Sequence, residues 1–502
     1  MREPLRQRTA GVIVALAIVL LGMLDGCAVG PDFVPPPPPG VTTYTAGTLR
    51  DTLSPGLGEA EQRLLLRQQL SADWWELFHS PDLTEAVRQA IAGNQTLAVA
   101  VATLAQAQDA LAQARAAFYP QINFGAGVSR QQPSSSNPRG TSTAPFSVFS
   151  LGPSASYVPD VFGGTRRHVE QEAALAESQK YELAAAYLTL TGNVVVQAIN
   201  IAGTRFQIAA AEEIVSNDEQ NLGLVRTKYD AGKAAETDVL IAESQLANDK
   251  AQLPPLRQQL SAARHALSIL LGKFPAEWSA PDFDLGELNL PGDLPLSLPS
   301  ELVHQRPDIL AAEANLHAAS AAIGVATAQL YPSITLSASA GQEAISAATL
   351  FGSSATVWSL AAGLTAPIFE GGALAAQWQG AVAAFDGSLA AYRQTVLLAF
   401  GQVADILDAL AHDADLVADQ RHALDVANAS LELQRLSYSA GKSDVLALLD
   451  SQRLDQQARL GYARAQTQRY QDTTQLFVAI GGRWWDASLG PLAPASEDTP
   501  PA

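Results

Sequence analysis

The chain has 502 residues, a net charge of −19 and a single cysteine. This acidic balance excludes nucleic acid as an expected partner, because phosphate backbones bind clustered Lys and Arg. One cysteine excludes a disulfide framework. The composition also stays uniform from about residue 80 to 480, which favours one repeating architecture over several separate domains.

The N-terminal segment has the plan of a cleaved export signal. Arginines precede an apolar run from Gly11 to Leu24, which is shorter than the ~20 residues of a membrane-spanning helix and is followed by Asp25-Gly26-Cys27. We expect residues 1–26 to be a signal peptide and Cys27 to be the lipid acceptor. Asp25 departs from the usual pattern before such a cysteine, and a buried or reactive thiol is the alternative for Cys27.

The residues after Cys27 favour the outer membrane. Ala28 stands where an aspartate would resemble the signal that retains lipoproteins in the inner membrane. The tract from Pro35 to Pro39 is stiff and extended, so it suits a tether between a lipid anchor and a folded body. We expect residues 27–70 to comprise the anchor, this linker and an N-terminal segment.

The remainder of the chain contains an internal repeat. Three motifs recur in the same order, at offsets of 212, 208 and 209 residues, which indicates a duplication. They are Ala114–Ile122 with Ala326–Ile334, Pro159–Gly164 with Pro367–Gly372, and Tyr229–Lys233 with Tyr438–Lys442. We expect a first repeat at 71–280, a linker at 281–300, a second repeat at 301–485 and a disordered tail at 486–502.

Apolar residues at helical spacing predict long helices in both repeats. The stretch from Thr165 to Tyr229 would span roughly 100 Å if unbroken, more than a small globular domain can contain. Its alanines permit close coiled-coil packing, and composition bias is the alternative reason for them. The predicted helices are Leu83–Phe118, Thr165–Tyr229, Asp238–Leu271, Ile309–Leu330, Leu374–Tyr438 and Val445–Ile480.

After each Tyr-Pro pair the sequence period changes to two. The alternating segments Gln121–Val128, Phe149–Tyr157, Ser333–Ala340 and Trp358–Thr365 predict four strands, in hairpins at about 120–158 and 332–366. One face is aliphatic and aromatic and the other is rich in Ser, Gly and Thr, as in a transmembrane barrel, although a half-buried soluble sheet gives the same alternation. Because a barrel needs at least eight strands, a spanning chain must oligomerise.

Taken together, these motifs resemble the TolC-like outer membrane factors, in particular the lipidated branch typified by OprM and NodT. The resemblance is carried by Cys27–Phe33, Trp74-Trp75, Asp82-Leu83, Arg306–Ile309, Ala312-Glu313, Ile323-Gly324, Tyr331-Pro332, the two Tyr-x-Ala-Gly motifs and Val445–Gln452. It implies a mainly α fold with a β-barrel. Three chains would each give four transmembrane strands to a twelve-stranded barrel, and the long helices would form a coiled-coil periplasmic tunnel.

Gly232 and Gly441 lie where one long helical pattern ends and the next begins, as a chain reversal requires. In the resembling family the two hairpin tips, here at about 229–238 and 438–444, dock a periplasmic adaptor protein. The resemblance therefore implies adaptor contacts at Tyr229, Gly232, Lys233, Tyr438, Gly441 and Lys442.

Channels of the resembling family close at this same end, through the helix that precedes the second tip. That helix carries Asp425, Asn428, Glu432 and Arg435 at a spacing of three or four residues, and thus on one face. Three copies of this candidate constriction would focus a negative potential and favour cations or polar solutes. A solvated helix face is the alternative for each residue.

The sequence shows no catalytic or metal-binding pattern, so we expect neither enzymatic activity nor a cofactor. His412 and His422 lie ten residues apart, and neither a nucleophile elbow nor a P-loop occurs. The expected function is the outer-membrane channel of a tripartite efflux system, a passive exit duct for small molecules such as drugs or solvents. The expected partners are a periplasmic adaptor, an inner-membrane pump of the RND type and outer-membrane lipid. A type I protein secretion channel and a non-conducting coiled-coil envelope scaffold are the alternatives.

Overall fold

The computed structural model describes residues 28–47, 50–54, 61–68, 70–132 and 144–482. The signal peptide, Cys27 and the tail at 486–502 lie outside these described residues. The chain divides into two compact units, each assembled from three stretches of sequence. The first unit contains residues up to Pro36, Ala105–Ser178 and Ala312–Tyr392, and the second contains Pro37–Leu104, Gln179–Ala311 and the residues from Arg393 onward.

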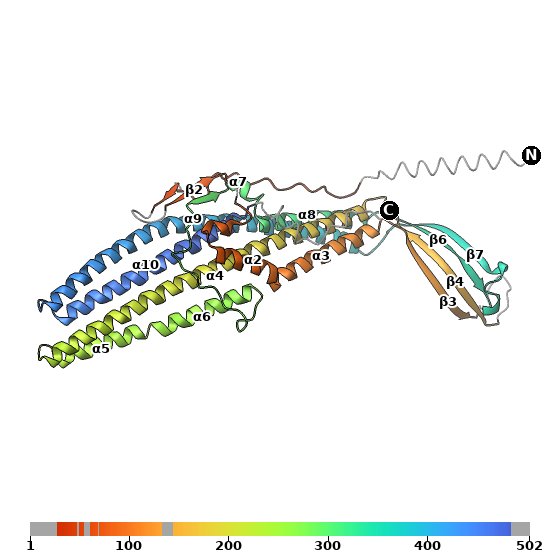
Figure 1. Cartoon of the computed structure of the whole chain (residues 1–502). Helices are drawn as coiled ribbons and strands as arrows, with labels where there is room; N and C mark the ends of the chain where they lie inside the picture. The colour runs from red at the N-terminus through yellow and green to blue at the C-terminus, as the bar shows by residue number, and fades with distance from the viewer. Residues whose placement is uncertain (1–27, 48–49, 55–60, 69, 133–143, 483–502) are drawn as a thin grey trace, which may run out of the picture. The chain divides into compact units, whose positions relative to one another are not determined.

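The first unit contains a four-stranded antiparallel sheet (Figure 1). Its strands are β3 (Gln121–Gln131), β4 (Phe146–Tyr157), β6 (Ser333–Ala344) and β7 (Thr356–Thr365), in the order β3-β4-β6-β7. The two predicted hairpins are therefore present, and the β4–β6 pairing joins one repeat to the other. Two short 3-10 helices, η2 (Ala347–Thr349) and η3 (Ser353–Ala355), lie between β6 and β7.

The strand register separates two chemically different faces of this sheet. Phe124 lies opposite Pro153, Tyr157 opposite Leu336 and Ala340 opposite Trp358, so the large apolar side chains share one face. In the single chain this face is uncovered, and Trp358 is 73% exposed. The other face carries Ser, Gly, Thr and Asn side chains, among them Ser339 and Ser359, whose hydroxyls hydrogen-bond at 2.8 Å.

Pro153 and two glycines shape the seam between the repeats, which is the pairing of β4 with β6. Pro153 has no N–H to donate, and the pairing is interrupted between Leu151↔Gln342 and Ser154↔Ser339. There the backbones of Gly152 and Gly341 approach so closely that a Cβ on either residue would collide with the opposite strand. Glycine at both positions therefore lets the two repeats pair despite the proline.

The long helices predicted from the periodicity are present. The two longest, α4 (Gly164–Asp230) and α9 (Ala373–Ser439), have 67 residues each. The others are α8 (Pro307–Ala328) and α10 (Val445–Ile480), together with the shorter α2 (Pro81–Gly93), α3 (Gln95–Ala116), α5 (Glu236–Lys250), α6 (Leu253–Leu270) and α7 (Pro299–Leu302).

Two of the predicted helices are each divided in the structure. The stretch Leu83–Phe118 forms α2 and α3, because Asn94 adopts an extended backbone and its Oδ1 caps α3 by accepting a hydrogen bond from the Leu97 N–H at 2.9 Å. The stretch Asp238–Leu271 forms α5 and α6. Pro254 and Pro255 begin α6, where the missing N–H groups are tolerated.

The second unit also contains a small sheet, so the expectation of only four strands was wrong. It comprises β1 (Thr52–Leu53), β2 (Gln62–Leu66) and β5 (Asp293–Leu296), and β2 and β5 run parallel. These strands have only two to five residues each, too few to show the alternation that reveals a longer strand. A short 3-10 helix, η1 (Trp74–Phe78), places Trp74 and Phe78 against Phe477 in the unit's core.

Among the residues that the structure describes, three helices, α4, α8 and α9, are long and apolar enough to cross a membrane when only length and composition are considered. Their apolar character comes largely from alanine and other small residues that pack helix against helix. More than half of the most apolar stretch of α4 and of α8 is buried within the chain itself.

Candidate functional sites

The first helical hairpin reverses direction at Gly232. Gly232 has a φ of +69°, a left-handed conformation that costs a residue with a Cβ. The N–H of Lys233 donates to the Lys228 carbonyl at 2.8 Å, and the N–H of Gly232 donates to the Tyr229 carbonyl at 2.8 Å. The last carbonyls of α4 are thereby satisfied in a glycine-dependent cap.

The second hairpin repeats this cap at Gly441, whose φ is +71°. The N–H of Lys442 donates to the Ser437 carbonyl at 2.8 Å, and the N–H of Gly441 donates to the Tyr438 carbonyl at 3.1 Å. The following helix, α10, is capped by Asp444, whose Oδ1 accepts from the Ala447 N–H at 2.8 Å. The repeated motif therefore encodes one reversal geometry, used twice.

The two tip tyrosines occupy different environments despite their equivalent places in the repeat. Tyr229 is 43% exposed, whereas Tyr438 is 5% exposed. The Nζ atom of Lys228 lies 3.4 Å from the centroid of the Tyr438 ring and donates to its carbonyl at 2.6 Å. Of the candidate docking residues, Tyr229, Gly232, Lys233, Gly441 and Lys442 are exposed and Tyr438 is covered. Sequence reasoning missed Lys228.

The four candidate constriction residues do not form a single solvent-facing row. Asp425 and Glu432 are exposed, and they pair with Arg421 at 3.4 Å and Arg435 at 3.2 Å. Asn428 instead faces α10, where its Oδ1 accepts from Arg459 Nη2 at 2.8 Å.

Arg459 links three helices near these residues and was also missed from the sequence. It pairs with Asp455 of its own helix α10 at 2.8 Å and with Glu213 of α4 at 3.0 Å, in addition to Asn428 of α9. No repeat motif marks this arginine. Its contacts depend on helices that are distant in sequence.

A groove of about 400 Å³ lies between α4 and α9 near the tips. It is lined by Asn217 and Leu224 of α4 and by Glu432, Arg435 and Tyr438 of α9, among others. The structure thus brings two of the candidate constriction residues and one candidate tip residue to the same groove.

A pair of buried carboxyls, Asp218 on α4 and Asp249 on α5, joins the arms of the first hairpin. Burial, the hydrogen bond to Asp249 and the charge of that residue together raise the pKa of Asp218 to about 8, against the opposing charge of Arg435. Asp249 also accepts hydrogen bonds from glutamines of α5 and α10, including Gln456. The pair therefore holds a proton near neutral pH and contacts the second hairpin.

A second pair, Asp413 on α9 and Asp472 on α10, has the same character. Burial and the hydrogen bond to Asp472 raise the pKa of Asp413 to about 7, against the opposing charge of Arg469. In the sequence these aspartates resemble any polar residue of a long helix, so no pattern revealed them. Among the described residues, no group of three His, Cys, Asp or Glu side chains could hold a metal ion.

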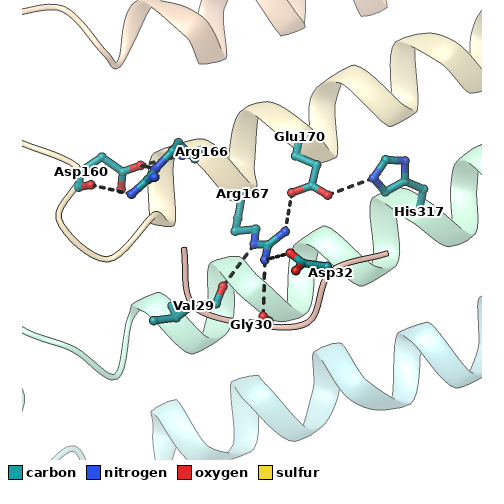
Figure 2. Close-up of polar contacts among 8 residues, drawn as sticks. All are labelled: Val29, Gly30, Asp32, Asp160, Arg166, Arg167, Glu170 and His317. Carbon is teal, nitrogen blue, oxygen red and sulfur yellow. Dashed lines mark hydrogen bonds and ion pairs between the residues drawn. The ribbon is translucent and has the colours of Figure 1, made fainter. Parts of the chain in front are cut away.

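In the first unit, Arg167 of α4 holds the segment that follows Cys27 (Figure 2). Its guanidinium donates to the carbonyls of Val29 at 3.2 Å and Gly30 at 3.4 Å, and it pairs with Asp32 at 2.7 Å. Glu170 accepts from Arg167 at 2.7 Å on its other side. We call Arg167, Glu170 and these three N-terminal residues the N-terminal clamp.

Three neighbouring interactions complete this region. Glu170 also contacts His317 of α8 at 3.0 Å (Figure 2). The ring of Phe33 stacks on the His317 ring at a centroid distance of 4.5 Å. Asp160 caps α4 by accepting from the N–H groups of Thr165 at 3.0 Å and Arg166 at 2.8 Å. This cap gives the Asp160 of the repeated motif a structural role.

Known proteins match the chain over most of its length. The family described as Outer membrane efflux protein matches residues 86–273 and 298–482. The pyoverdine export outer membrane protein OpmQ of Pseudomonas aeruginosa is 32% identical over 82% of this chain and 87% of its own length. The toluene efflux pump outer membrane protein TtgF of Pseudomonas putida is 30% identical over 95% of this chain and 98% of its own length.

Solved structures agree with these matches. The structure of the outer-membrane channel OprN superposes with a TM-score of 0.84 at 28% identity, and the match covers 91% of this chain and all of OprN. The resemblance drawn from the sequence motifs is confirmed, and so is the expected location in the outer membrane. The chain belongs to the outer membrane efflux protein family.

Proposed function

We propose that three copies of this chain form the outer-membrane channel of a tripartite efflux system, a passive exit duct for small molecules. The observation that carries the proposal is the uncovered apolar face of the four-stranded sheet, whose edges β3 and β7 are both open within one chain. Hydrocarbon tolerates neither an open edge nor a four-stranded barrel. Three copies would supply twelve strands, with the apolar faces toward lipid and the Ser and Gly faces toward the lumen.

The helical tips would serve docking and gating. Tyr229, Gly232, Lys233, Gly441 and Lys442 are exposed and suit contacts with a periplasmic adaptor, and Tyr438 would support the tip from beneath Lys228. In three copies, Asp425 and Glu432 would supply the carboxylates of the constriction. Asn428 would hold α9 against α10 through Arg459, whereas Arg435 would orient Glu432 within α9 itself.

Lipid on Cys27 would add a second attachment to the membrane. Cys27 lies two residues before Val29, which the N-terminal clamp holds, so the clamp would set where the acyl chains leave the body. The variant Cys27→Ser is expected to lose metabolic labelling by palmitate, with wild type as the positive control. Undiminished labelling of the variant would show that another residue carries the lipid.

The partners would be a periplasmic adaptor and an inner-membrane pump of the RND type, which supplies energy and selects the substrate. The relatives support small-molecule cargo, since OpmQ is named for pyoverdine export and TtgF for toluene efflux. Co-purification with an adaptor encoded beside a pump would support efflux. Association with a protein-exporting transporter would favour the secretion alternative.

Conductance in planar lipid bilayers tests the proposal directly. The wild-type trimer is expected to conduct poorly, and Asp425→Ala with Glu432→Ala is expected to raise the conductance and alter the cation preference. The control is Asp386→Ala, which removes an exposed carboxylate of α9 far from the tip in sequence. Absence of conductance from all three proteins would contradict the channel and favour a scaffold.

A further inference from the structure

An aromatic stack joins the two repeats at the β4–β6 seam. The rings of Phe162 and Tyr331 lie 4.8 Å apart between centroids, at an interplanar angle of 25°. Phe162 belongs to the connection from β4 to α4, and Tyr331 precedes Pro332 and β6. The stack therefore marks the place where the outgoing strand of one repeat meets the incoming strand of the other.

The two halves of an equivalent stack occur at the free edges of the sheet. Phe369 lies five residues after Leu364, in the connection from β7 to α9, as Phe162 lies five residues after Tyr157, in the connection from β4 to α4, although the Pro-to-Gly-Gly motif aligns Phe162 with Glu370. Tyr119 precedes Pro120 and β3, as Tyr331 precedes Pro332 and β6. Within one chain these rings belong to opposite edges, and both are exposed, Phe369 by 88% and Tyr119 by 71%. Exposure of two such rings at a strand end is costly unless they are covered on assembly.

We propose that Phe369 of one copy stacks on Tyr119 of the next copy, where β7 of the first pairs with β3 of the second. This inference rests on the proposed trimer and specifies its interface, because the duplication makes the β4–β6 seam a template for the seam between copies. The connection after β7 is then a contact between subunits, and each copy contributes one ring to each of its two neighbours.

The same template sets the strand register between copies. Tyr157, the last apolar residue of β4, pairs with Leu336, the fourth residue of β6. The counterparts are Leu364, the last apolar residue of β7, and Phe124, the fourth residue of β3. A slip by one residue would put Leu364 on the same face as polar or small side chains of β3, since a single step reverses every side chain.

This register also pairs Ala361 with Gly127 of the next copy on the opposite, small-residue face. Because β3 and β7 are the outer strands of a four-stranded sheet, they are separated within one chain by three strand spacings, about 14 Å. A disulfide needs Cα atoms within about 7 Å, so cysteines at these two positions can be bridged only between copies.

The first experiment oxidises the full-length chain carrying Ala361→Cys and Gly127→Cys, with Cys27 retained in every variant. We expect a covalent trimer on a non-reducing gel. The matched control pairs Ala361→Cys with Ser129→Cys, which is shifted by two residues and is expected to link at least about fivefold more slowly, because diagonal neighbours are about 7–8 Å apart. Faster linking in the control than in the predicted pair would overturn the register.

The second experiment measures the rate at which detergent-solubilised trimers dissociate. Phe369→Ala and Tyr119→Ala are each expected to raise it by roughly 2- to 12-fold per interface, the range for an aromatic pair, and the double variant is expected to add little to either. The control is Phe351→Ala, which removes a ring that is 77% exposed between β6 and β7.

The outcomes separate this inference from the proposed function. If the wild type forms a conducting trimer but Phe369→Ala dissociates no faster than Phe351→Ala, the stack is wrong and the channel stands. If the wild type remains monomeric in lipid, both the interface and the proposed channel are wrong.

Discussion

Lys228 lies over the ring of Tyr438, with its Nζ atom 3.4 Å from the ring centroid and 2.6 Å from the Tyr438 carbonyl oxygen. The lysine belongs to the first helical hairpin and the tyrosine to the second, so this contact joins the two hairpins at their tips. A cation over an aromatic ring contributes about 0.5–2 kcal/mol, depending on how far it is desolvated. The contact is thus well placed to resist separation of the hairpins.

Lys228→Met is therefore expected to open the channel more readily. A loss of about 1–2 kcal/mol corresponds to a roughly 5- to 30-fold change in an opening equilibrium, which would appear as a higher open probability in lipid bilayers. The control is Lys233→Met, which removes an exposed lysine of the same tip. Equal open probabilities for the two variants would show that the contact does not restrain opening.

The buried pair Asp218 and Asp249 makes stability depend on pH. Because burial raises the pKa of Asp218 from 3.8 to about 8, the folded chain holds a proton that the unfolded chain releases between these values. The contribution of Asp218 to the free energy of unfolding is then fully present below about pH 4 and is lost as the pH rises through about 8.

Thermal unfolding between pH 5 and pH 9 checks this dependence. Asp218→Asn keeps a neutral, hydrogen-bonding side chain of similar size, so its melting temperature should fall less with rising pH than that of wild type. Asp230→Asn, at the exposed end of α4, should follow the wild-type slope. Identical slopes for all three proteins would refute the assignment.

The left-handed glycines at the two tips are expected to be sensitive to substitution. Gly232→Ala and Gly441→Ala should each lower the free energy of unfolding by about 1–2 kcal/mol, because a Cβ is disfavoured at positive φ. Gly223→Ala should instead stabilise by about 0.5–1 kcal/mol, since Gly223 is helical and open space surrounds the added Cβ. The two kinds of variant should therefore shift the unfolding temperature in opposite directions.

Arg167→Ala is expected to release the N-terminal clamp. The guanidinium is buried and makes charged hydrogen bonds to two carbonyls and two carboxylates. Its removal should lower the free energy of unfolding by about 2 kcal/mol, a value kept small because the Asp32 carboxylate is exposed and its charge is screened by water. Limited proteolysis should then cut residues 34–47 faster than in wild type. Arg88→Ala, which removes an exposed pair with Glu85, should leave the cleavage rate unchanged.

Periodicity predicted the elements that are long and regular. The alternation of Gln121–Val128 and Trp358–Thr365 gave strands in the correct places, and the helical spacing gave α4 and α9 within a residue of their ends. The repeated Tyr-x-Ala-Gly motif located both chain reversals. These successes rest on patterns within ten or so neighbouring residues, where local physics decides the conformation.

Features that depend on distant partners were not predictable in this way. Tyr229 and Tyr438 occupy the same position of the repeated motif, yet only Tyr438 is covered. Lys228 of the first hairpin lies over the Tyr438 ring, whereas the equivalent residue of the second hairpin is Ser437, which has no such long cationic side chain. Asp218 meets Asp249 for a similar reason. The break at Asn94 was different, since an asparagine after Gly93 is a local cap signal that could have revealed it.

The parallel pairing of β2 with β5 has a consequence for biogenesis. Leu64 pairs with Leu294, about 230 residues later in the chain. A protein that is exported across the inner membrane from its N-terminus emerges gradually. β2 therefore remains unpaired with β5 until more than half of the polypeptide has crossed. Closing so long a loop is slow, because its entropy must be lost before the pairing rewards it. The small sheet therefore cannot form until the chain has been exported at least as far as β5, at the boundary between the two repeats.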